Sequence, residues 1–215
     1  MKTPDTDLEL VLKALKEFGL LLETDARLPS VSSLVARETV RGSWWAHARS
    51  HEIFAVLQQV ADHQDVAVTR LVSEKVTFVH RLLWPDLLSI AMSREKWQVE
   101  ALPPEARMLL QMTDRHGELR SDTLEWPAKF KSMKTGQTVR ELEKRLLIHS
   151  EEFHSESGAH AKLLETWEHW TERVRFKHKL VEVGEAKRKL EEQLSDLNKQ
   201  FEAFARLPWI KTLKA

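Results

Sequence analysis

Residues 105–124, EARMLLQMTDRHGELRSDTL, begin the stretch that decides the fold. Met108, Leu109 and Met112 recur at helical spacing before the chain breaks at Gly117, and a short extended run follows at residues 118–120. Ser121 then stands where a serine caps a helix whose first turn carries an acid. The pattern predicts a helix, a short strand and a second helix.

The unit continues through residues 138–164, TVRELEKRLLIHSEEFHSESGAHAKLL. A third helix is predicted at residues 138–146, because Val139, Leu142 and Leu146 share one side. Two short extended runs flank a serine- and glycine-rich loop at residues 155–158, which indicates a hairpin. Helix, short strand, two helices and hairpin is the order of the winged helix-turn-helix, a fold that mostly contacts nucleic acid.

A single uninterrupted helix is the competing interpretation of the hairpin segment. It would place His149, Glu156 and His160 in one apolar seam, but the Ser/Gly-rich loop favours a turn. In the hairpin interpretation, Phe153 is expected to pair with His160, Lys162 with Glu151 and Leu164 with His149.

The first hundred residues repeat this outline. Helices are predicted at residues 7–22, 31–35 and 50–60, a hairpin at residues 66–80, and a further helix that opens at Trp84-Pro85-Asp86. The predicted class is therefore mainly α with short β-hairpins (α+β), with one winged-helix-like module at residues 1–100 and a winged helix-turn-helix module at residues 104–170.

The C-terminal part differs from both modules. Leu190, Leu194, Leu197 and Phe201 alternate three and four residues apart, which predicts a long amphipathic helix of coiled-coil type at residues 171–206, and a single helix over residues 163–206 is one version of it. Such a helix needs a partner. The partner is either the first module or a second chain, and the latter would give a homodimer.

Composition bounds the function without naming it. The 215 residues carry 33 basic and 33 acidic side chains, so net charge gives no argument for nucleic acid. The absence of cysteine excludes disulfides, thiolate metal sites and cysteine nucleophiles. No apolar run reaches the length of a membrane span, and the acidic amphipathic start is unlike a signal peptide. We expect a cytoplasmic protein without a membrane segment.

Histidine and glutamate are densest on the second hairpin. Imidazole and carboxylate groups serve as general acids and bases, so these side chains are the strongest candidates for activating water. Their spacing matches no metal-ligand signature, and we expect neither a metal nor a cofactor. The candidate catalytic residues are His149, Glu152, His154 and His160, together with His47 from the first module.

Adjacent tryptophans beside arginine form a second group. Trp44 and Trp45 point in different directions on any regular backbone, so one can pack inward while the other stacks on a base. Basic residues on the first hairpin and on the third helix of the second module are placed to contact phosphates or base edges. The candidate nucleic-acid contacts are Arg41, Trp44, Trp45, Lys75, His80, Arg81, Arg140, Lys144 and Arg145.

The hairpin followed by Trp84-Pro85-Asp86, together with PPEARMLLQMTDRHGELRSDTL at residues 103–124, resembles the bacterial tandem winged-helix DNA glycosylases that excise alkylated or cross-linked bases. This resemblance implies a tandem winged-helix fold and a DNA partner. Those enzymes activate water with a Gln-x-Gln or Gln-x-Asp pair. Gln58-Gln59 and Gln111 do not supply such a pair.

Three functions follow from these patterns. The first is a winged-helix DNA-binding protein in DNA repair or processing, with base excision as its reaction if the candidate catalytic residues converge on one cleft. The second is a transcription regulator that dimerises through its C-terminal helix. The third is an adaptor that binds protein rather than DNA.

Overall fold

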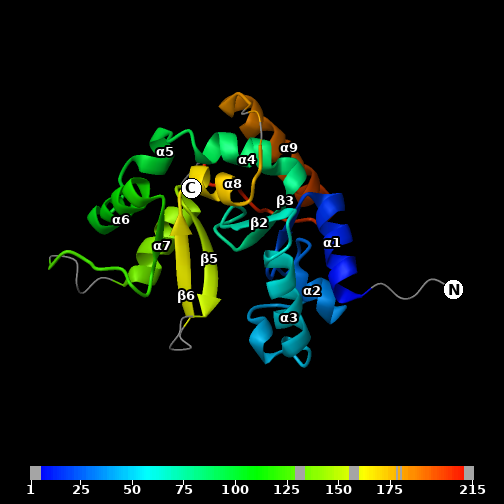
Figure 1. Ribbon diagram of the computed structural model, residues 1–215. Coiled ribbons are helices and arrows are strands. Elements are labelled where there is room, and N and C mark those ends of the chain that lie inside the picture. The colour runs from blue at the N-terminus through cyan, green and yellow to red at the C-terminus, as the bar shows by residue number, and fades with distance from the viewer. Residues whose placement is uncertain (1–5, 129–133, 155–159, 178, 180, 211–215) are drawn as a thin grey trace.

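The computed structural model describes residues 6–128, 134–154, 160–177, 179 and 181–210. Two units lie side by side beneath a layer of helices, and helix α3 of the first unit and the second hairpin point the same way (Figure 1). The first unit comprises α1 (Asp7–Phe18), β1 (Leu20–Leu22), α2 (Val31–Ala36), the 3-10 turn η1 (Trp44–Ala46), α3 (Ser50–Ala61), β2 (Val66–Thr69) and β3 (Thr77–His80). The second comprises α6 (Pro104–His116), β4 (Glu118–Arg120), α7 (Thr135–Lys144), β5 (His149–His154) and β6 (His160–Glu165).

The remaining elements connect and cover these units. They are η2 (Arg81–Leu83), α4 (Trp84–Ala91), α5 (Lys96–Val99), α8 (Trp167–Arg173) and α9 (Val183–Gln200). The helix that was expected to open at Trp84-Pro85 is confirmed as α4, with the proline in its first turn.

Each unit contains one antiparallel three-stranded sheet, in the order β1-β3-β2 in the first and β4-β6-β5 in the second. In both sheets, the strand that follows the first helix pairs with the last strand of the hairpin. The two units therefore share one topology, and the predicted α+β class is confirmed. In both, the first strand of the hairpin, β2 or β5, is a sheet edge.

Helix α1 ends earlier than its apolar pattern predicted. Thr6 and Glu9 cap its start reciprocally, and Gly19 ends it with a φ of 70°. A Cβ on Gly19 would lie 2.9 Å from Leu83 Cδ1, so that position has neither the conformation nor the space for a side chain. The predicted helix over residues 7–22 was wrong at its end, because Leu20–Leu22 pair with β3 instead.

The second hairpin is confirmed, and its register differs from the expected one by one residue. Phe153 pairs with Ala161 instead of His160, and His149 lies opposite Glu165. This register brings two buried ionisable side chains together. A one-residue shift would turn one of them to the opposite face of the sheet.

The predicted helix after Ser121 is absent from residues 121–127, which form turns and extended chain. The Ser121 hydroxyl accepts a hydrogen bond from the Lys162 backbone N–H instead, at 2.7 Å, and so ties this segment to β6. The next helix, α7, begins three residues earlier than expected.

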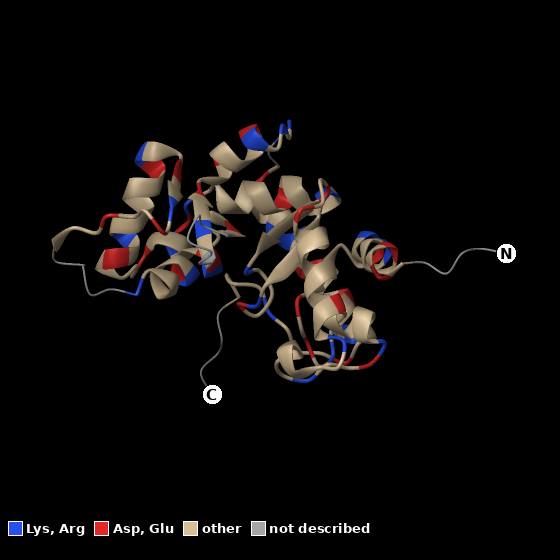
Figure 2. Cartoon of the chain, turned by 60° about the horizontal axis from the view of Figure 1, so that its bottom comes forward, with Lys and Arg blue, Asp and Glu red and all other residues tan. Residues whose placement is uncertain are grey.

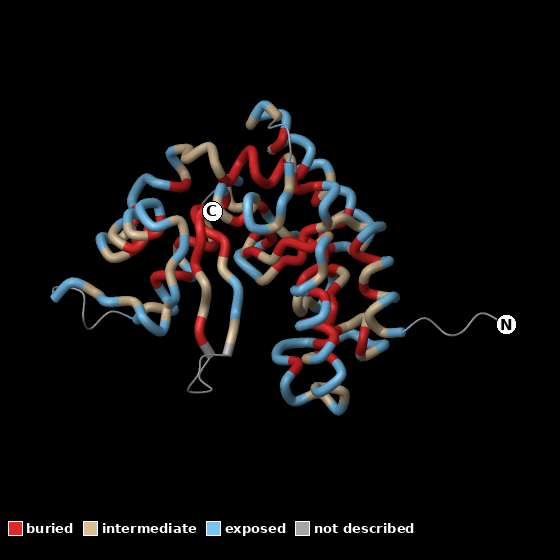
Figure 3. Tube along the Cα trace, viewed as in Figure 1, coloured by how far each residue is buried: buried red, intermediate tan, exposed pale blue. Residues whose placement is uncertain are grey.

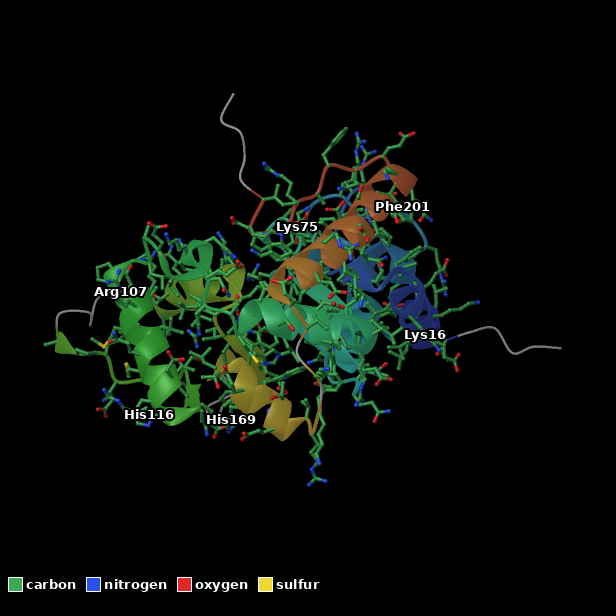
Figure 4. All side chains as sticks on the ribbon, turned by 90° about the horizontal axis from the view of Figure 1, so that it is seen from above. Lys16, Lys75, Arg107, His116, His169 and Phe201 are labelled. Atoms are coloured by element: carbon green, nitrogen blue, oxygen red, sulfur yellow. The ribbon has the colours of Figure 1, made fainter. Side chains whose placement is uncertain are left out.

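The C-terminal helix is shorter than the predicted residues 171–206, and a single helix over residues 163–206 is wrong. Residues 163–165 belong to β6, the central strand of its sheet, and Thr166 caps the separate helix α8. The apolar side of α9, with Ala186, Leu190, Leu194 and Leu197 buried, joins the core that contains α4. Figure 4 shows α9 running across α4, with Phe201 at its end.

The partner of α9 is therefore α4 of the same chain. The side that predicted a dimer seam is covered within the chain, so nothing in the structure supports dimerisation through it. The deepest burial lies where α4 and the two sheets meet (Figure 3). Leu20 and Val79 of the first unit share one core there with Leu146 of the second and with Trp84 and Leu190, so residues of both units pack together.

Candidate functional site

A cleft of about 670 Å³ lies between the two units. Its first wall comes from η1, α3, β2 and β3, and its second wall from β5, β6 and α8. The edge strands β2 and β5 lie near one another in it. The described side chains that bear on function here are Glu23, Trp44, Trp45, Phe54, Thr69, Arg70, Arg81, Glu143, His149, Ser150, Glu151, Glu152, Phe153, Lys162 and Arg173.

The first wall carries a stacked pair of indoles. Trp44 is 4% exposed, whereas Trp45 is 65% exposed. Their ring centroids are 4.0 Å apart, with 24° between the ring planes, and Phe54 packs against both. The Trp44 Nε1–H donates to Glu23 Oε1 at 2.7 Å, which fixes the inner ring. The expectation that one tryptophan packs inward and the other faces solvent is confirmed.

The second wall carries Phe153 and Glu152. The guanidinium of Arg120 lies 4.8 Å from the centroid of the Phe153 ring. Glu152 is exposed opposite Lys162, and among the described residues it forms no hydrogen bond or ion pair. Its carboxylate is therefore open to the cleft.

A cluster around Glu165 lies behind this wall. Glu165 is 0% exposed and accepts hydrogen bonds from His149 Nδ1 at 3.1 Å, from His169 Nδ1 at 3.0 Å and from Arg173 Nη2 at 2.6 Å. Burial alone would raise the pKa of Glu165, but the hydrogen bonds from these three side chains lower it to about 2. The cluster is satisfied within itself and holds β5, β6 and α8 together.

A second charged cluster joins the two units. Glu143 of α7 receives Arg70 Nε at 2.9 Å, Lys162 Nζ at 2.6 Å and the Ser150 hydroxyl. Burial would raise the pKa of Glu143, but the charge of Lys162 and these hydrogen bonds lower it overall. Lys144 pairs with Glu74 at 2.5 Å, so the turn between β2 and β3 is attached to α7 at two points.

Thr69, at the end of β2, has a buried hydroxyl that lacks a hydrogen-bond partner among the described residues, unlike the buried carboxylates of Glu143 and Glu165. The residue lines the cleft. A buried hydroxyl without a partner costs stability.

The predicted catalytic residues meet only in part. His149 and Glu152 line the cleft that Trp44 and Trp45 line, but His149 is buried and engaged by Glu165. His47 is outside the cleft lining and pairs with Glu38 at 2.8 Å. The side chains of His154 and His160 lie outside the described residues.

The predicted nucleic-acid contacts divide into engaged and open side chains. Arg145 donates to the backbone carbonyls of residues 97, 98 and 100 and pairs with Glu141, so its role is structural. Lys75 pairs with Asp25 at 2.7 Å. Arg81 pairs with Asp65 and lies over the Trp84 and Phe176 rings, and the His80 ring accepts from Leu82 N–H. Arg41 and Arg140 are exposed without an ion pair among the described residues.

Sequence reasoning missed Glu23, Arg70, Glu143, Glu165 and Arg173. Each acts through a partner brought close by the fold, with Arg70 and Glu143 separated by 73 residues. The four-residue spacing of Glu165 and His169 suggests one helical face, but Glu165 ends β6 and only His169 lies in α8.

Along the described part of both units, basic and acidic residues are interspersed (Figure 2). Among the described residues, no group of three or more histidine, aspartate or glutamate side chains could hold a metal ion. Within the same part of the chain, no helix has both the length and the apolar character that a bilayer span requires.

A protein-family model described as "AlkZ related" matches residues 6–206. The match covers both units and α9, and the chain belongs to this family. No curated protein and no solved structure matches the chain. The family places the protein with relatives of a DNA glycosylase and agrees with the resemblance found in the sequence. The match carries no information on catalytic residues.

Proposed function

We propose that this protein is a winged-helix DNA-binding protein of DNA repair, and that its cleft holds a base turned out of a duplex. The observation that carries the proposal is Trp45, a largely exposed indole stacked on a buried one inside a cleft of about 670 Å³. Family membership supports the role in repair. Shared topology supports the interpretation of both units as winged helices, at residues 1–100 and 104–170.

Trp45 suits this role because it is rigidly supported. Stacking of a base on an aromatic ring is worth about 1–3 kcal/mol, and enzymes and binding proteins that extrude a base offset its unstacking in this way. The fixed Trp44 ring beneath Trp45 limits the motion of the Trp45 side chain before a base binds. Binding of a base therefore costs less side-chain entropy.

The second unit is the side that we assign to the duplex. Helix α7 exposes Gln137 and Arg140 and is followed by the hairpin β5–β6, the arrangement by which a winged helix reads a groove and flanks it. Helix α3 of the first unit exposes Glu52, and the exposed Asp62 follows its last residue, which disfavours phosphate contact there.

Fluorescence anisotropy with two DNA duplexes, one fully paired and one with a single-base bulge, tests the proposal. We expect tighter binding of the bulged duplex. Trp45→Ala should remove about fivefold of that preference, the loss of about 1 kcal/mol of stacking. Leu82→Ala is the matched control, because Leu82 is equally exposed but lies outside the cleft lining.

Equal binding of both duplexes by the wild type would exclude the base-holding cleft. No binding of either duplex at low salt would exclude DNA and favour a protein partner, which the neutral net charge also suits.

Base excision is the second candidate function, and one observation favours it. The open carboxylate of Glu152 lines the same cleft as Trp45, where it could activate water beside a held base. Incubation of alkylated and undamaged duplexes with wild type and Glu152→Gln, followed by scoring of abasic sites, tests it. Product from the wild type that falls sharply in Glu152→Gln would support catalysis, and no product from any duplex would exclude it.

A further inference from the structure

The edge of the tryptophan platform carries a carboxylate that the proposed function does not use. Glu23 follows β1, and its backbone N–H donates to Val76 O at 3.0 Å, which continues the strand pairing beyond Leu22. Its side chain is half-buried and lines the cleft. One oxygen, Oε1, accepts from Trp44 Nε1 at 2.7 Å, so the carboxylate lies at the rim of the indole that supports Trp45.

Its second oxygen is unused. Among the described residues, no group donates to Glu23 Oε2, although a carboxylate has about four acceptor positions. Glu143 at this cleft is held by Arg70, Lys162 and Ser150, and Glu151 is paired with Arg173, whereas Glu152 is open but is fixed by no hydrogen bond among the described residues. Glu23 is thus a positioned acceptor beside an exposed aromatic face.

We infer that Glu23 and Trp45 together form a subsite selective for nucleobases that carry an amino group, that is adenine, cytosine and guanine, over thymine. The inference rests on the proposed function, since it assumes that a base enters the cleft. Trp45 would contact the face of the base, for which every base is suitable. Glu23 would contact its edge, where the bases differ.

The selectivity follows from the hydrogen-bond donors and acceptors that each base presents to the Glu23 carboxylate. An ionised carboxylate accepts hydrogen bonds and donates none. Adenine and cytosine each offer an amino group, and guanine offers an amino group next to a ring N–H, so all three can donate to Glu23. Thymine has a single ring N–H between two carbonyl oxygens. When that N–H donates to Glu23, both flanking oxygens lie close to the carboxylate, and their repulsion makes this contact weaker than one from an amino group.

Four DNA duplexes that differ only in a single bulged base, A, C, G or T, test this subsite by fluorescence anisotropy. We expect the wild type to bind the A, C and G bulges about fivefold more tightly than the T bulge, the lower end of the discrimination that a well-placed base contact gives. Glu23→Gln keeps an oxygen that can accept from Trp44 and adds an amide donor. It should bind all four bulges within about twofold, mainly through tighter binding of thymine.

Glu17→Gln is the matched control, because it removes the same charge from an exposed position on α1 outside the cleft lining. It should retain the wild-type order of the four bulges. A merely structural role for Glu23 would weaken all four duplexes equally and leave their order unchanged, and that result would overturn the inference.

Two further outcomes separate this inference from the proposed function. If the wild type prefers bulged to paired DNA but binds all four bulges equally, the base selectivity is wrong and the proposed function stands. If the wild type shows no preference for bulged DNA, both are wrong.

Discussion

Removal of the charge of Glu165 is the most direct test of what holds the second unit together. Glu165→Gln preserves the shape of the side chain, but its single amide oxygen can accept from either His149 or His169 and not from both, because the two histidines bond to different oxygens of Glu165. It leaves the Arg173 guanidinium with Glu151 as its remaining acidic partner. The substitution therefore removes the buried negative charge together with one acceptor, and the pH dependence of its effect separates the two.

The magnitude follows from the pKa of Glu165. A folded-state pKa of about 2, below the ordinary value of 4.5, means that the folded protein favours the ionised form. This shift corresponds to about 3 kcal/mol of stability, which is present above pH 4.5 and is lost as the pH falls towards 2. Glu165→Gln should therefore lower the free energy of unfolding by about 3 kcal/mol at pH 7 and by little near pH 2.

Urea unfolding followed by tryptophan fluorescence at several pH values between 2 and 7 measures this difference. Glu172→Gln serves as the control, because Glu172 is exposed on α8 next to Arg173, and it should match the wild type at each pH. A Glu165→Gln variant whose deficit is the same at pH 2 and pH 7 would refute the reasoning. Its effect would then come from packing rather than from charge.

Three further outcomes are expected. Leu194→Asp buries an unpaired charge between α9 and α4 and should cost several kcal/mol, whereas a melting temperature and mass unchanged from the wild type would show that α9 is not packed there. Arg145→Ala frees three backbone carbonyls and should lower stability by about 1–3 kcal/mol without altering the salt dependence of DNA binding. Arg140→Ala should leave the stability unchanged and reduce the salt dependence of DNA binding, because the exposed Arg140 side chain has no ion pair among the described residues. A melting temperature lowered as far as in Arg145→Ala would contradict this.

The sequence predicted those elements whose signals are local. Helix α6, strand β4 and the second hairpin follow from apolar spacing and from a loop rich in serine and glycine. Strand β1 was missed because Leu20–Leu22 continue the apolar spacing of α1, and only the left-handed conformation of Gly19 separates the two. The helix predicted after Ser121 failed because that hydroxyl binds the backbone of a strand 41 residues away.

In the candidate site, too, the sequence predicted only those features that depend on neighbouring residues. Trp44 and Trp45 could be predicted as one inward and one outward ring, because adjacent residues cannot share a direction. Whether a basic residue is free could not be predicted, since the partners of Lys75 and Arg145 come from distant segments. The hairpin register was wrong by one residue for a related reason, because a buried histidine and glutamate determine it and their burial is not visible in the sequence.

The attachment of the β2–β3 turn to α7 has a consequence for how a ligand is received. Arg70 and Lys144 join this turn to the second unit at one end of the cleft, so its walls are already held at a set distance before anything binds. Under the proposed function, the cleft that receives a base is already formed, and little binding energy is lost in ordering its walls. By the same proposal, selection of a lesion would then depend on how easily the base leaves its duplex, because the protein itself changes little.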